Sequence, residues 1–157
     1  MVLEEIAEEE CLELLGRTGF GRVALVDKEH RPLIVPINFS LTPEGIAIRT
    51  DAGTSLEQGS QHRVALEVDD VNPSTHEGWS VLVRGNAFDV TDTLDDRSER
   101  LRATEVDTWA PGEKARRILI RISVVTGRRL RLLPTSSHED SARAALVDPR
   151  EPAHGTA

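Results

Sequence analysis

The stretch Gly45-Ile-Ala-Ile-Arg-Thr50 has the pattern of a short apolar strand that ends in an arginine and a hydroxyl, and Gly53-Thr-Ser-Leu-Glu57 follows almost at once. In the second stretch a glycine and two more hydroxyls open a short helix, which we expect over residues 54–60. A guanidinium, side-chain hydroxyls and the N–H groups at the start of a helix are groups that hold anions. The two stretches together predict a phosphate site at the end of a strand.

Short apolar segments separated by polar turns lie on both sides of this site. We expect strands over residues 19–26, 31–40, 45–50, 62–69 and 79–90, and one or two more over 115–133, broken near Thr126 and Gly127. Because Pro36 has no N–H, it should mark a bulge or an unpaired position in its strand. Gly85 should kink the fifth strand. Many short strands with few helices predict a closed or nearly closed antiparallel β-barrel, since closure leaves no free edge.

Two further helices and a polar C-terminal segment complete the expected domain. Apolar residues recur at helical spacing over residues 7–15, with Gly16 as the expected end, and another helix is expected over 94–110, stopped by a Pro-Gly pair. Residues 71–78 have the composition of a loop. From residue 134 the chain has no clear period, so we expect a domain over 1–134 and a mostly disordered tail over 135–157.

Composition excludes several classes of function. The chain has 157 residues and a formal net charge of −8, which fits one acidic domain and argues against nucleic-acid binding. A single cysteine, Cys11, allows no internal disulfide, and five histidines without ligand spacing indicate no metal site. There is no apolar run long enough to cross a bilayer and no signal-peptide pattern at the start. We expect a soluble, cytoplasmic protein without a membrane partner.

The order of the motifs is more specific than any one of them. The motifs are Gly21-Arg-Val-Ala-Leu-Val26, Arg31-Pro-Leu-Ile-Val-Pro-Ile-Asn-Phe39, Ile48-Arg-Thr50, Gly53-Thr-Ser-Leu56, Val64-Ala-Leu-Glu-Val-Asp-Asp70, Gly78-Trp-Ser-Val-Leu-Val-Arg-Gly85, Trp109-Ala-Pro-Gly112 and Thr126-Gly-Arg-Arg-Leu130. In this order they resemble the pyridoxamine 5′-phosphate oxidase-like family, the FMN-binding split barrels, in its short actinobacterial form. The resemblance covers residues 5–133.

The resemblance implies a mainly β (α+β) fold, a six-stranded antiparallel split barrel that forms a homodimer with two flavin sites at the interface. It implies that Arg49, Thr50 and Thr54, with Ser55 beside them, hold the FMN phosphate. It also implies that Val35, Pro36, Ile37 and Asn38 follow the isoalloxazine edge, mainly through backbone groups, and that Trp79 and Ser80 lie near the flavin. The expected activity is flavin-dependent oxidation or reduction of an unknown small molecule.

One position departs from the family pattern, in which the phosphate loop carries a lysine where this chain has Ser55. The lost charge-assisted hydrogen bond is worth about 1.5–3 kcal/mol, or about one to two decades of affinity. Two alternatives follow: a reductase that uses the deazaflavin coenzyme, and a non-catalytic dimer that binds flavin or haem. The substrate-binding residues of the longer oxidases have no match, so we do not expect oxidation of pyridoxamine phosphate.

Several site residues also have structural interpretations. Arg49 can pair with Asp51 or Glu67 on the barrel surface. Thr54-Ser-Leu-Glu57 matches a capping box. Trp79 fits a core or dimer-interface anchor equally well, and Trp109 is expected to be structural.

Overall fold

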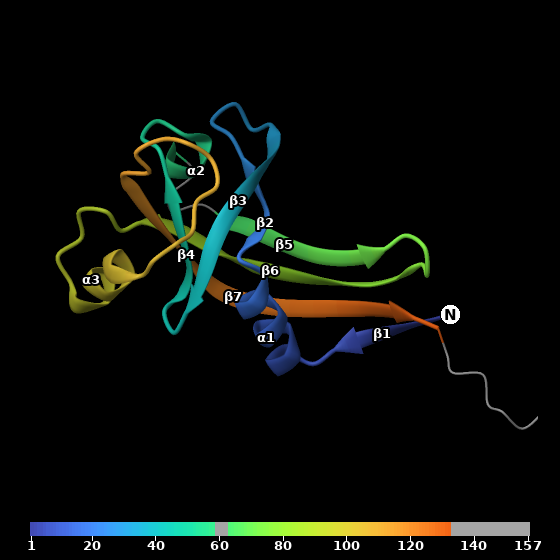
Figure 1. Ribbon diagram of the computed structural model, residues 1–157. Helices are drawn as coiled ribbons and strands as arrows, with labels where there is room; N and C mark the ends of the chain where they lie inside the picture. The colour runs from blue at the N-terminus through green and yellow to red at the C-terminus, as the bar shows by residue number, and fades with distance from the viewer. Residues whose placement is uncertain (59–62, 133–157) are drawn as a thin grey trace, which may run out of the picture.

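Six antiparallel strands form a closed ring in the computed structural model, which describes residues 1–58 and 63–132 (Figure 1). The ring runs β7-β4-β3-β2-β5-β6 and closes where β6 pairs with β7; β1 lies outside it, along β7. The described elements are β1 (Val2–Ile6), α1 (Glu8–Thr18), β2 (Phe20–Val26), β3 (Pro32–Thr42), β4 (Gly45–Thr50), α2 (Ser55–Gln58), β5 (Arg63–Asn72), β6 (Glu77–Asp89), α3 (Asp96–Ala103) and β7 (Arg116–Arg131). The predicted six-stranded antiparallel barrel with short helices is confirmed.

The core of the ring comes from alternate residues of its strands. In β2, Val23 and Leu25 are buried, whereas Arg22 and Ala24 are exposed. This is the period of two that places successive side chains on opposite faces of a sheet. β4 differs because its outer face is also covered: Ala47 packs in a second apolar cluster with residues of α3 and β7.

β1 is a strand that sequence periodicity did not predict. It runs antiparallel to the far half of β7, from Ile6 opposite Gly127 to Val2 opposite Arg131. Two adjacent glutamates give the segment low strand propensity. The strand forms because all five of its residues pair with the far end of β7, much later in the chain; Glu4 also lies 2.7 Å from Arg131.

Two helices end at residues other than those predicted. α1 continues past Gly16 to Thr18, and Gly19 ends it in the left-handed conformation, with φ of 67°. α3 ends at Ala103 instead of residue 110, because Thr104 takes up an extended conformation and Val106 is buried in the second apolar cluster. Burial of this extended segment outweighs its helical pattern.

The long strands are more continuous than predicted. β7 passes through Gly127 without a break, because the missing side chain leaves room for the thiol of Cys11 on α1. β5 and β6 pair as far as Asn72 and Glu77, so the predicted loop over 71–78 is only a short turn. At Gly85, where a kink was predicted, β6 is continuous and its register with β7 shifts.

The split that gives this barrel its shape lies between β3 and β4. The two strands pair only over Phe39–Thr42 and Gly45–Ile48, and the rest of β3 pairs with β2 alone. The N–H of Phe39 points to Gly19 beside β2. Because N–H directions alternate along a strand, the missing N–H of Pro36 falls on the split side. The prediction that Pro36 occupies an unpaired position is confirmed.

No helix within the described residues is long and apolar enough to span a membrane. The expected tail, residues 135–157, lies outside the described residues. So do residues 59–62, which include the end of the helix predicted over 54–60 and the first residue of the strand predicted over 62–69.

Candidate functional site

Two threonine hydroxyls meet at the end of β4. Thr50 is the last residue of β4, Thr54 comes just before α2, and their Oγ1 atoms are 3.0 Å apart. The Glu57 N–H donates to Thr54 Oγ1 at 3.4 Å, and the Glu57 carboxylate accepts from the Gly53 N–H. The predicted capping box therefore forms, with the carboxylate bound one residue before its usual partner. Ser55 opens α2, which is a single turn.

Arg49 leaves β4 on the opposite face from Thr50, as adjacent strand residues do. Its guanidinium donates to the carbonyl oxygens of Glu113 and Lys114 over 3.3–3.4 Å. These bonds to neutral acceptors leave its charge uncompensated by a carboxylate within the described residues. The structure thus brings Thr50 and Thr54 together, whereas the guanidinium of Arg49 lies on the other face of β4, at the loop that precedes β7.

The carboxylates proposed as partners of Arg49 bind other cations. Asp51 accepts from the Lys114 ammonium at 2.7 Å and from the Lys114 N–H at 2.9 Å. Glu67 lies 3.3 Å from Arg22. The interpretation of Arg49 as the ion-pair partner of Asp51 or Glu67 is wrong.

Two cations lie near the phosphate-loop position that has lost its lysine, and both are already paired. The hydrogen bonds from Lys114, first from its ammonium and then from its N–H, lower the pKa of Asp51. Arg116 is opposite Thr50 on β7, and its Nε is 2.7 Å from Glu57. Neither cation offers an unpaired charge to replace the lysine.

β3 carries the residues predicted to follow the flavin ring to the edge of the split. Val35 is half-buried and Ile37 buried against the ring core, whereas Pro36 is exposed on the other face. By the alternation described above, the backbone N–H and C=O of Asn38 and the C=O of Pro36 face the split. This edge presents donors and acceptors beyond the last pair with β4.

The Asn38 side chain has one satisfied and one unsatisfied atom. Its Oδ1 accepts the backbone N–H of Trp109 at 3.0 Å. Its Nδ2 is buried and has no hydrogen-bond partner within the described residues. A buried donor without an acceptor lowers the stability of the fold by about 1–3 kcal/mol, so the Asn38 amide indicates that a hydrogen-bond acceptor binds here.

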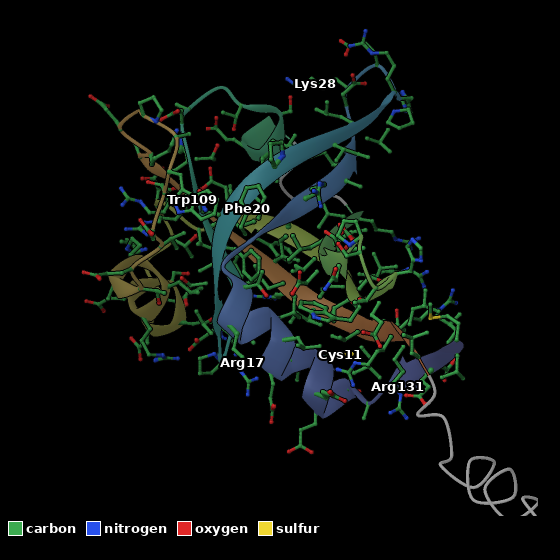
Figure 2. The ribbon with its side chains drawn as sticks, turned by 45° about the vertical axis from the view of Figure 1, so that its right-hand side comes forward. Cys11, Arg17, Phe20, Lys28, Trp109 and Arg131 are labelled. Atoms are coloured by element: carbon green, nitrogen blue, oxygen red, sulfur yellow. The ribbon has the colours of Figure 1, made fainter. Side chains whose placement is uncertain are left out.

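Trp109 is a residue whose place beside the site sequence reasoning missed. Its ring stacks on Phe20 at 4.9 Å, with 12° between the planes, and remains 67% exposed. Figure 2 shows the two rings side by side near β3. A tryptophan in a chain that is only 3% aromatic was the available signal, but only the fold reveals its contact with Asn38.

Trp79 and Ser80 lie far along the sheet from the threonines. Thr50 is opposite residue 116 of β7 and Trp79 is opposite residue 129, a separation of 13 residues. At about 3.3 Å per residue this is a contour of about 40 Å. Trp79 is half-buried against the core, as its interpretation as a core anchor required. Ser80 lines a separate pocket beside β1. One subunit does not bring these two residues to the threonines.

The described residues also contain groups that could bind a metal or act as a nucleophile, among them Cys11. Within the described residues, no three His, Cys, Asp or Glu side chains lie together as metal ligands. Cys11 is buried, and burial, with a contribution from Glu10, raises the pKa of its thiol. The arrangement is therefore suited to holding an anion and a planar polar ring.

Comparison with known proteins agrees with this description. The profile of the family described as pyridoxamine 5′-phosphate oxidase matches residues 7–134, most of the chain, so the chain belongs to the pyridoxamine 5′-phosphate oxidase-like family. An uncharacterized protein of Mycobacterium tuberculosis is 30% identical over 94 residues, which are 56% of this chain and 61% of that protein. The chain thus spans about three fifths of that curated relative.

Two solved structures extend the match to the whole barrel. The FAD-binding protein from Mycobacterium smegmatis is 30% identical with a TM-score of 0.66, over 84% of this chain and 100% of that one. A putative pyridoxamine 5′-phosphate oxidase from Corynebacterium glutamicum is 29% identical with a TM-score of 0.64, over 84% and 96% of the two chains. The split-barrel fold and the actinobacterial relationship expected from the motifs are confirmed.

Proposed function

We propose that this chain binds a flavin in the split between β3 and β4 and acts as a homodimeric oxidoreductase on a small molecule. The supporting observation is the divergence of the two strands beyond Phe39 and Ile48, beside the Thr50–Thr54 pair. A flavin needs hydrogen-bonding groups along its ring and a site for its phosphate, and this split offers both. The family membership and the FAD-binding relative support the same cofactor class.

The ring edge is assigned to β3. The stretch from Val35 to Asn38 follows the pyrimidine edge of the ring, with the C=O of Pro36 and the N–H and C=O of Asn38 facing it. An accepting ring oxygen at Asn38 Nδ2 offsets the cost of that buried donor. The residues present therefore fit a flavin ring.

The phosphate is assigned to the hydroxyls of Thr50 and Thr54 and the N–H of Ser55, with the guanidinium of Arg49 reaching it from the other face, around the end of β4 at Thr50. Arg49 is the cation of this set, since Lys114 is bound to Asp51. Without the family's lysine we expect flavin affinity about one to two decades below that of a chain that has it. FMN has the ring and the phosphate that these residues would bind, and FAD carries the same ring and the same first phosphate.

The second subunit completes the site in this proposal. Trp79 and Ser80, on β6, are too far along the sheet to reach the threonine end of the site in their own chain, so they contact the flavin bound to the partner. The bound flavin supplies electron transfer, while the chain orients the ring, binds the phosphate and shapes access for the substrate.

The first experiment is an absorbance spectrum of the purified protein, followed by titration with FMN, FAD and the deazaflavin coenzyme. We expect uptake of FMN or FAD, with binding weakened about tenfold in T50V/T54V. Thr75→Val, in the exposed β5–β6 turn, is the matched control and should bind as the original protein does. Preference for the deazaflavin would reassign the cofactor, and failure to bind any of the three would refute the proposal.

A further inference from the structure

A second pocket lies outside the ring, against the outer faces of β4 and β7. It measures about 730 Å³ and is bounded by the end of α3 and by the extended segment 104–107. This volume is in the range of small-molecule sites. Its lining brings three arginines together from three elements: Arg49 from β4, Arg102 from α3 and Arg117 from β7.

The three guanidinium groups hydrogen-bond to backbone carbonyls. Arg49 donates to residues 113 and 114, Arg117 to Thr104 at 3.1 Å, and Arg102 to Val90 and Thr93. In the part of the chain that the structure describes, none of the three is within ion-pair distance of a carboxylate. The carbonyls fix the orientation of these side chains and leave their charges uncompensated.

Two of these charges are direct neighbours. Arg49 is opposite Arg117 in the β4–β7 register, and like charges in this position repel each other. Burial, followed by the charge of Arg49, lowers the pKa of Arg117. The pocket also contains Glu105 and Asp107, but both are exposed and neither pairs with an arginine. The pocket therefore has an excess of positive charge held by half-buried side chains.

We propose that this arginine pocket binds a phosphate or diphosphate group. The planar fork of an arginine presents paired N–H donors that match phosphate oxygens, and an anion between Arg49 and Arg117 relieves their repulsion. The group has two possible sources: the diphosphate of FAD, whose other end lies in the split, or a free phosphorylated small molecule. The first source rests on the flavin proposal, and the second does not.

The test measures binding of inorganic pyrophosphate, ADP, FMN and FAD to the full chain by calorimetry. Arg102→Gln and Arg117→Gln should each weaken pyrophosphate or ADP binding about tenfold or more. Arg97→Gln removes an exposed arginine of α3 outside the pocket and should leave binding unchanged. Arg117→Lys keeps the positive charge but lacks the planar fork of N–H donors, so it should bind pyrophosphate and ADP better than R117Q and less well than the original chain. It replaces R117Q in the test if R117Q does not fold.

The outcomes separate the two sources and the two proposals. Weaker FAD binding in the R102Q and R117Q variants, with FMN binding unchanged, assigns the pocket to the FAD diphosphate. Loss of pyrophosphate or ADP binding, with both flavins unaffected, assigns it to a free ligand. Pyrophosphate binding in a protein that takes up no flavin supports the pocket and refutes the flavin proposal. The pocket proposal is wrong if pyrophosphate and ADP do not bind and neither variant changes FAD affinity.

Discussion

Single residues set the local geometry of this barrel, and Gly45 is the tightest example. It starts β4 with φ of 137°, and a Cβ there would clash with the carbonyl oxygen of Ile120 and lie 3.1 Å from Leu119 Cδ1. Both the backbone conformation and the approach of β7 therefore require glycine. The turn before β4 depends on this position for its close contact with β7.

We expect Gly45→Ala to lower the free energy of unfolding by about 2–4 kcal/mol, because strain and overpacking add. Gly53→Ala is the matched control. Gly53 also has a positive φ, of 77°, but no atom lies within 4 Å of the Cβ it would gain. The control should cost about 1 kcal/mol. Urea unfolding of both variants checks the difference, and equal losses would contradict the argument from the β7 contact.

The Asp51 carboxylate predicts part of the pH dependence of stability. Its pKa in the folded chain lies below the ordinary 3.8, mainly because the Lys114 side chain donates to it. The stabilisation is therefore complete above pH 3.8 and is lost as the pH falls through the lower folded pKa. Asp51→Asn should flatten the decline of Tm below about pH 4. Asp70→Asn, an exposed carboxylate on β5, is the control; a D51N profile matching that of the original chain would count against this role.

At the scale of elements, close packing around Gly127 holds α1 and β1 against β7. The Cβ of an alanine at Gly127 would lie 2.5 Å from Cys11 Sγ and 3.1 Å from Ile6 Cβ. The Glu4–Arg131 pair on the outside is exposed to solvent, and such pairs contribute little. Close packing therefore dominates over charge in this region.

Gly127→Ala should lower the free energy of unfolding by about 1–3 kcal/mol, because α1 must move away from β7. Glu4→Gln should change it far less, since it breaks only the exposed pair. Denaturant unfolding of the two variants gives the comparison. A larger effect from Glu4→Gln would show that the ion pair, and not the packing, holds β1.

Elements defined by local pattern were predictable, whereas those defined by distant partners were not. Strands of the ring such as β2 alternate between buried and exposed residues, and the unpaired position of Pro36 followed from its missing N–H. β1 depends on β7, and the end of α3 depends on burial of Val106, so neither appears in a local pattern. The same holds for the site. The helix cap made by Thr54 and Glu57 lies within four consecutive residues and could be predicted, whereas the position of Arg49 opposite Arg117 exists only in the folded sheet.

At the scale of the whole molecule, the proposed dimer makes a prediction about shared sites. If Trp79 serves the partner's flavin, Trp79→Leu and T50V/T54V damage the same site from different chains. Mixing the two variants should restore tight flavin binding in about a quarter of the sites, because half the dimers are mixed and each has one intact site. Flavin titration of the mixture, with light scattering for the mass, checks this. Absence of recovery after subunit exchange would show that Trp79 does not contribute to the partner's site.

The order of the strands also sets when the chain can fold during synthesis. β7 pairs with β1, β4 and β6, and it is the last strand of the described chain. Until residue 131 has left the ribosome, β1 has no partner, β4 and β6 each lack one of their two neighbours, and the ring stays open between them. Pairing over such long sequence separations is slow and leaves strand edges exposed to other chains. A nascent chain of this protein is therefore most prone to aggregation just before β7 appears.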